Sequence, residues 1–180
     1  MIRHRVFRCG SAILASVIGL AGIGVIGSEA LAFTGRPAPD LTTPRWINSP
    51  PRSLGDFRGS VVLVEFWTFG CVNCRNVEPQ IKRWHEAYMN RGLVVVGIHS
   101  PEFGYEKSLD AVTQYVREHA ITYPIVVDND FSIWNRYGNR YWPAIYLIDK
   151  RGMIRYTRFG EGGYADTERM IDRLLAEAAE

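Results

Sequence analysis

Cysteine is scarce in this sequence, with three residues in a chain of 180. Cys9 lies near the N-terminus, which leaves Cys71 and Cys74 as the cysteines of the remaining chain. A small domain that is held together by disulfides shows four, six or more cysteines. The sequence therefore excludes a disulfide framework, and the length is sufficient for one domain with a hydrophobic core of its own.

An excess of charge of one sign is missing as well. The formal net charge is +2 at pH 7. Residues 1–32 hold three arginines and one glutamate, so the remainder has 18 basic and 18 acidic residues. Proteins that bind nucleic acid or anionic membranes electrostatically carry a basic patch or stripe. The composition therefore predicts neither kind of partner.

A long hydrophobic run is also absent. Residues 11–27 are uncharged and apolar or small, but this run is shorter than the ~20 apolar residues of a transmembrane helix. Arginines precede the run, and Ala30-Leu31-Ala32 follows it as a small-x-small cleavage site. The pattern predicts a signal peptide over residues 1–32 and a periplasmic or other extracytoplasmic location. An uncleaved N-terminal membrane anchor is the alternative.

Alternating strand and helix patterns begin at Val61. Continuous aliphatic and β-branched runs predict buried strands, and apolar residues at helical spacing predict the helices between them. The predicted strands cover residues 61–66, 93–98, 124–128, 144–149 and 153–159. The predicted helices cover residues 77–88 and 109–116, a helical turn at 130–138, and a last helix that is capped by Asp166.

This order of elements predicts an α/β fold with one central mixed sheet flanked by helices. Helical crossovers join the first strands, which should therefore be parallel, whereas the short link at 149–152 predicts an antiparallel hairpin. Residues 33–60 are rich in Pro, Gly and Arg and are predicted to form a lead-in with a short hairpin near Trp46. Residues 61–180 are predicted to form the main domain.

The stretch WTFGCVNCRNVEP at residues 67–79 holds both remaining cysteines as a CxxC pair. Cys71 falls where a predicted strand ends and a helix begins, so backbone N–H groups and the helix dipole should favour its thiolate. Cys74 lies one turn further along the same face, within reach of a disulfide with Cys71. We predict that Cys71 attacks a partner disulfide and that Cys74 resolves the mixed disulfide.

An acidic residue, Glu65, stands inside the apolar strand VVLVEFW. Burial of a carboxyl group is costly and would raise its pKa toward neutrality. A buried Glu65 could then accept the proton of Cys74. The alternative is that Glu65 points to solvent or to a sheet edge.

A CxxC pair can also be half of a zinc site, which would need two further Cys or His ligands at similar spacing. No second cysteine pair is present, and His85, His99 and His119 are scattered along the chain. Each of these histidines is interpreted as a surface or internally bonded residue. We predict no metal and no cofactor beyond a redox-active Cys71–Cys74 disulfide.

Taken together, these residues resemble the thioredoxin superfamily, and in particular its exported TlpA-like and DipZ-like thiol-disulfide oxidoreductases with a redoxin domain. The resemblance runs from about Pro39 to the C-terminus and rests on SLGDFRGSVVLVEFWTFGCVNC, ITYPIVVDND and YGNRYWPAIYLIDKRG. It implies a thioredoxin-like fold with a central insertion at residues 101–140 and an N-terminal extension.

The resemblance also implies roles for individual residues. Cys71 takes the place of the nucleophile, Cys74 that of the resolving cysteine, and Glu65 that of the buried carboxylate. Pro79 matches the proline of the active-site helix. Pro143 matches the cis-proline that sits against the cysteine pair and aligns a bound substrate chain.

The same comparison indicates substrate contacts. Trp142 precedes Pro143 and is predicted to touch substrate, with Val72 and Asn73 between the cysteines as further candidates. In thioredoxins Gly-Pro stands where this chain has Val72 and Asn73, and Trp stands where it has Gly70. The dipeptide between the cysteines tunes the reduction potential in this superfamily.

The resemblance finally implies protein thiols and disulfides as substrates, a membrane electron donor of the CcdA/DsbD type, and a monomer. It favours a reductant of periplasmic proteins. Two other classes stay open. A thiol peroxidase would place Thr or Ser three residues before its reactive cysteine, where this chain has Thr68. A non-catalytic interaction domain would carry the cysteine pair as a passive disulfide.

Overall fold

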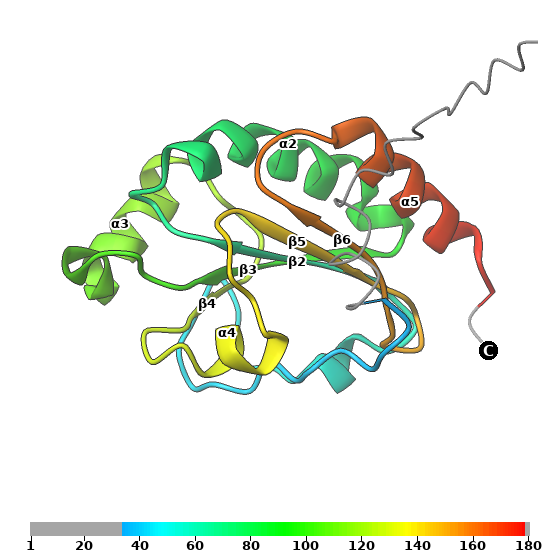
Figure 1. Cartoon of the computed structure of the whole chain (residues 1–180), viewed down its shortest axis with the longest axis horizontal. Coiled ribbons are helices and arrows are strands. Elements are labelled where there is room, and N and C mark those ends of the chain that lie inside the picture. The colour runs from blue at the N-terminus through cyan, green and yellow to red at the C-terminus, as the bar shows by residue number, and fades with distance from the viewer. Residues whose placement is uncertain (1–33, 179–180) are drawn as a thin grey trace, which may run out of the picture.

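The computed structural model describes residues 34–178, so the predicted signal peptide lies outside the described residues. Within this range, six strands form one mixed sheet in the order β1-β4-β3-β2-β5-β6 (Figure 1). The parallel part comprises β2 (Val61–Trp67), β3 (Leu93–His99) and β4 (Ile125–Val127). β5 (Ala144–Ile148) pairs antiparallel with both β2 and β6 (Ile154–Phe159). The predicted α/β fold with a mixed sheet is confirmed.

Helices cover both faces of the sheet. On one face lie α2 (Val72–Tyr88), α3 (Leu109–Glu118) and α5 (Tyr164–Ala176), and on the other lies α4 (Ser132–Tyr137), as Figure 1 shows. Short 3-10 helices complete the described chain: η1 (Leu54–Phe57), η2 (Met89–Arg91) and η3 (Gly104–Lys107). Among residues 34–178, no helix combines the length and the apolar character that crossing a membrane requires.

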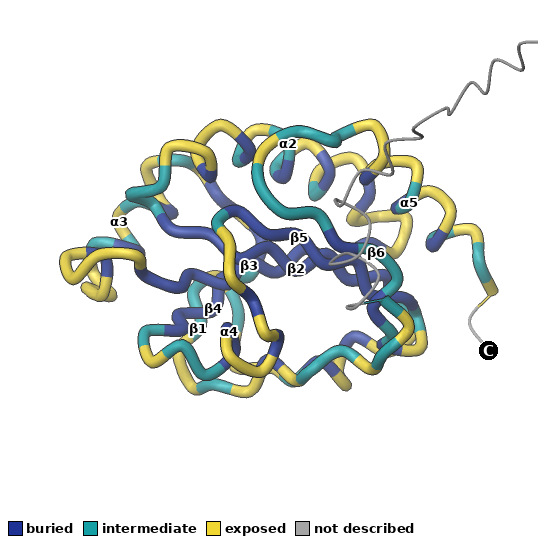
Figure 2. The backbone as a smooth tube through the Cα atoms, viewed as in Figure 1, coloured by how far each residue is buried: buried dark blue, intermediate teal, exposed yellow. Residues whose placement is uncertain are grey.

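Each face of the sheet has its own hydrophobic core, because successive side chains of a strand point to opposite faces. Val61 and Leu63 of β2 pack with the buried side of α2, whereas Val62 and Phe66 pack with α4 and the lead-in. The central strands are therefore buried on both sides, and they lie between the more exposed helices in Figure 2. This explains why their sequences are continuously apolar.

Two local predictions were wrong. Instead of a hairpin, the lead-in forms β1 (Trp46–Ile47), which extends the sheet by pairing antiparallel with β4. The partner strand lies far along the chain, so no local pattern reveals the pairing. The last helix begins at Tyr164, with Gly163 as its N-cap at a φ of 67°, and Asp166 lies in its first turn. A glycine accepts this left-handed backbone conformation without the steric penalty of a side chain.

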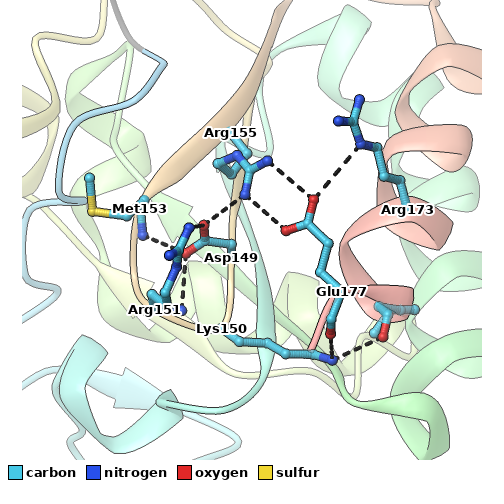
Figure 3. A network of polar contacts seen from close by, with 8 residues as sticks. Asp149, Lys150, Arg151, Met153, Arg155, Arg173 and Glu177 are labelled. Atoms are coloured by element: carbon cyan, nitrogen blue, oxygen red, sulfur yellow. Dashed lines mark hydrogen bonds and ion pairs between the residues drawn. The ribbon is translucent and has the colours of Figure 1, made fainter. Parts of the chain in front are cut away.

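A polar network fixes the link between β5 and β6 (Figure 3). Asp149 accepts the backbone N–H groups of Arg151 at 3.0 Å and Met153 at 2.9 Å, together with the guanidinium of Arg155 at 3.0 Å. Arg155 also donates to both carboxylate oxygens of Glu177, at 2.9 and 3.1 Å. The network therefore attaches the chain that follows α5 to the end of the hairpin.

Gly97 of β3 occupies a position where a side chain does not fit. An added Cβ would lie 2.6 Å from Cδ1 of Ile125 and 2.8 Å from Nε1 of Trp67. We expect Gly97→Ala to lower the free energy of unfolding by about 1–3 kcal/mol because it overpacks the core. Urea unfolding measures this change.

Gly104→Ala is the matched control, because a Cβ at Gly104 would meet nothing within 4 Å. It should leave the free energy of unfolding unchanged or raise it by less than about 1 kcal/mol. Equal destabilisation by the two substitutions would contradict the packing around Gly97.

Candidate active site

The alternation of side chains along β2 directs every second residue toward α2. Val61, Leu63 and Trp67 belong to the core beneath α2, and Glu65 lies in the same alternating series. Glu65 is only 2% exposed. The predicted burial of this acid is therefore confirmed, and the solvent-facing alternative is wrong.

The two cysteines stand at the start of α2, directly after the loop that leaves β2. Cys71 is the N-cap residue, and its Sγ accepts the backbone N–H of Cys74 at 3.3 Å. This N–H is one of the donors that the first turn of a helix leaves unpaired. Both cysteines are free thiols in this structure; Cys71 is partly exposed and Cys74 is buried. Burial, reinforced by the hydrogen bond with Cys71, raises the pKa of the Cys74 thiol far above its ordinary value.

The carboxyl group of Glu65 has no hydrogen bond to its Oε1 from any described residue. Burial raises the pKa of Glu65 to about 8, and the nearby charge of Glu78 adds to this rise. Glu78 itself accepts the hydroxyl of Tyr115 at 2.8 Å and lies 3.1 Å from Nδ1 of His119. An acid with a pKa near neutrality is well suited to exchange a proton with a thiol. Glu65 is close enough that its charge adds, after burial, to the raised pKa of the Cys74 thiol.

A groove of about 360 Å³ opens beside Cys71 and contains the three residues that were predicted to contact substrate. Its lining consists of Gly70, Cys71, Val72, Asn73, Glu102 and Trp142. Trp142 is held in place by its indole N–H, which donates to the carbonyl of Ser100 at 2.9 Å. The Trp142–Pro143 peptide bond is cis, as the resemblance implied. The contact of these residues with substrate stays a prediction.

Sequence reasoning missed Glu106, which is completely buried beside the cysteine pair. Its Oε1 accepts the N–H of Gly70 at 2.8 Å, and its Oε2 accepts those of Glu102 at 2.6 Å and Phe103 at 2.8 Å. The segment PEFGYEKS reads as an exposed loop. The one trace of Glu106 in the sequence is the glycine at position 70, directly before Cys71. In the structure, a Cβ at Gly70 would overlap Glu106 and lie 2.6 Å from the hydroxyl oxygen of Tyr105. Position 70 therefore has no room for a side chain, which explains the glycine before Cys71.

His99 was interpreted as a surface or internally bonded residue, and it is completely buried at the end of β3. Its Nε2 lies 3.3 Å from Oγ1 of Thr68, while its Nδ1 has no partner among residues 34–178. Burial lowers the pKa of His99 to about 4, so the ring is neutral at physiological pH. The Thr68 hydroxyl, the feature that suggested a peroxidase, therefore has the buried His99 ring as its neighbour.

The three histidines among residues 34–178 belong to separate parts of the fold. His85 lies in α2, His99 ends β3 and His119 follows α3. Within the described part of the chain, no three His, Cys, Asp or Glu side chains gather closely enough to hold a metal ion.

A CxxC pair at the start of the helix after β2, on a mixed sheet that is covered on both faces, defines a thioredoxin-like protein. In agreement, the structure is similar to that of a thiol-disulfide isomerase from Corynebacterium glutamicum, with a TM-score of 0.73 and 27% identity. That match covers 80% of this chain and 99% of the isomerase chain. Residues 34–157 match the AhpC/TSA family, and the chain belongs to this family.

Two relatives narrow the class further. The chain is 43% identical to protein DipZ of Mycobacterium bovis over 145 residues. The matched region covers 78% of this chain and 21% of DipZ. It is 31% identical to thiol-disulfide oxidoreductase YkuV of Bacillus subtilis over 143 residues. This matched region covers 79% of this chain and 96% of YkuV. The chain therefore spans about a fifth of the DipZ length, 21%, and nearly all of YkuV. The resemblance to thioredoxin-like oxidoreductases is confirmed.

The role of Glu65 as a base can be tested by its pH dependence. With a pKa raised to about 8, Glu65 is mostly protonated at lower pH and becomes an acceptor as the pH rises through that value. In the wild type, the rate at which Cys74 resolves a mixed disulfide should therefore rise with pH and level off above about pH 8–9. In Glu65→Gln we expect a rate at least about a hundredfold lower near neutrality and no plateau.

Reaction of the reduced protein with one equivalent of dithiobis(nitrobenzoate) separates the two steps. The first thionitrobenzoate leaves when Cys71 attacks, and the second leaves when Cys74 resolves. Glu86→Gln, which changes an exposed glutamate of α2, is the control and should keep the plateau. An unchanged pH profile in Glu65→Gln would remove Glu65 from the mechanism.

Proposed function

We propose that this chain is an exported thiol-disulfide oxidoreductase that reduces disulfides of other proteins. The observation that carries the proposal is the unequal placement of the two sulfurs. Cys71 borders an open groove at a helix N-terminus, and Cys74 is buried one turn further on. The names of the relatives and of the similar structures support the same reaction class.

The reaction begins when the thiolate of Cys71 attacks one sulfur of a partner disulfide. The partner's S–S bond breaks, its second sulfur leaves as a thiolate that takes up a proton, and a mixed disulfide forms. Cys74 then gives its proton to the carboxylate of Glu65 and attacks the sulfur of Cys71. The first partner thiolate leaves, so the partner has gained two electrons and the chain holds a Cys71–Cys74 disulfide.

The surroundings of Cys74 support the direction of this reaction. A disulfide catalyst becomes strongly oxidising when its reduced form is stabilised, chiefly by a favoured thiolate. Here burial disfavours the Cys74 thiolate, as the raised pKa of its thiol reflects. Ionisation of Cys74 therefore adds no stabilisation to the dithiol form.

The proposal includes the cellular setting. The basic, apolar and small-residue pattern of residues 1–32 supports export to the periplasm or another extracytoplasmic site, with an uncleaved anchor as the alternative. A reductant in an oxidising compartment needs electrons from elsewhere. We therefore include a membrane dithiol donor of the CcdA/DsbD type as partner, and a monomer as the working unit.

Replacing the cysteines one at a time tests the reaction. Cys71→Ser should abolish reduction of insulin by dithiothreitol-supplied electrons beyond the uncatalysed rate, because the attacking sulfur is lost. Cys74→Ser should still attack but cannot resolve, so it should accumulate mixed disulfides that appear as reducible adducts on a gel.

The double variant, Cys71→Ser with Cys74→Ser, is the control and should form no adduct. Full turnover by Cys71→Ser would contradict the proposal. Absence of both turnover and adducts in every form would instead indicate a passive cysteine pair in an interaction domain.

A further inference from the structure

Two large aromatic side chains stand exposed next to the groove of Cys71. Phe103 is 50% and Tyr105 is 61% exposed, although aromatic side chains of this size usually find cover in a folded protein. Their rings stack at 5.8 Å with an interplanar angle of 5°. We call this pair the docking ledge. Val72, which is 58% exposed between the cysteines, adds a third apolar side chain at the same opening.

The docking ledge is continuous with the active site. Glu102, the residue before Phe103, lines the groove together with Cys71. Tyr105 packs against Phe69 with ring centroids 5.8 Å apart, and its hydroxyl lies over Gly70, the residue before Cys71. A polypeptide that places a cysteine against Cys71 therefore passes beside these rings.

Glu106 fixes the position of the docking ledge relative to the cysteines. Its buried carboxyl group joins the backbone N–H groups of Glu102 and Phe103 to that of Gly70. Burying a carboxyl group is costly unless donors satisfy it, and here three backbone donors do so. The loop is therefore clamped to the residue before the attacking sulfur, so the rings are pre-positioned before a substrate arrives.

The chemistry of this opening indicates the occupant. Glu102 is the one charged residue in the lining of the groove, and Val72, Phe103 and Tyr105 expose apolar side chains at or next to this opening. Successive residues of an extended chain are ~3.3 Å apart, so a side chain two or three positions from the reacting cysteine reaches ~7–10 Å from it. An extended segment can bring an apolar side chain near its cysteine onto the rings, whereas a globular surface would not enter the groove as readily.

We propose that Phe103 and Tyr105 bind an aromatic or large aliphatic side chain of an extended substrate polypeptide, two or three residues from the cysteine that Cys71 attacks. This inference rests on the proposed disulfide exchange. It makes the enzyme selective for unfolded or flexible protein segments whose cysteines have apolar neighbours.

The test uses two disulfide-linked peptide dimers that differ in one residue, with Phe or Ala two positions from the cysteine. We expect the reduced wild type to react about tenfold faster with the Phe peptide, as burial of one such contact allows. The double variant Phe103→Ala with Tyr105→Ala should lose this preference. Its rate with hydroxyethyl disulfide, which is too small to reach the docking ledge, should stay within about twofold of the wild type.

Met89→Ala is the matched control, because Met89 is 50% exposed and lies beyond the opposite end of α2 from Cys71. It should keep the preference for the Phe peptide. Equal rates for the two peptides in the wild type, or a preference that survives in the double variant, would overturn the proposal. Sedimentation that shows a dimer dissociated by the double variant, with peptide preference unchanged, would assign the rings to self-association instead. Failure of the wild type to react even with hydroxyethyl disulfide would count against the exchange reaction itself.

Discussion

The burial of Glu65 is the constraint around which the site is arranged. Its carboxyl group is 2% exposed in the middle of a strand whose other residues are apolar. Such burial costs free energy that a leucine or valine at this position would not cost. The strand directs this group beneath the first turns of α2, where its charge also disfavours the thiolate of the buried Cys74. In the proposed reaction, this buried carboxylate is the group that accepts the proton of Cys74.

Two elements divide the work of the site. In the proposed reaction, the junction of β2 and α2 supplies the sulfurs and the base. The loop before α3 holds the docking ledge, which we propose selects the partner. Glu106 joins the two through the backbone of Gly70. Because that contact is with the backbone, it constrains the position of the loop while Cys71 remains open to the groove.

Much of the fold could be predicted because its signals are local. The runs VVLVEF and LVVVGI are apolar because both strands are covered on two faces. The spacing of Val77 and Ile81 marks the buried side of α2. The CxxC pair and Glu65 could be found for the same reason, since each stands out within its own segment.

The remaining features depend on contacts between distant segments. β1 exists because Trp46 pairs with Val126 of β4. The two residues of β1 show no strand pattern by themselves. Glu106 belongs to a polar, exposed sequence, and only the approach of Gly70 makes it a buried clamp. His99 ends an apolar strand, and its neutral state follows from burial rather than from any neighbour in sequence. Side chains whose role is set by tertiary contacts leave little trace in a single sequence.

The reduction potential of the Cys71–Cys74 pair tests the account most directly. Equilibration of residues 33–180 in dithiothreitol or glutathione buffers gives the fraction oxidised at each ratio. The proposed role as a reductant predicts a value near that of thioredoxin, roughly −270 mV. A value toward roughly −120 mV would mean that the dithiol form is strongly stabilised, and it would contradict the assignment of this protein as a reductant.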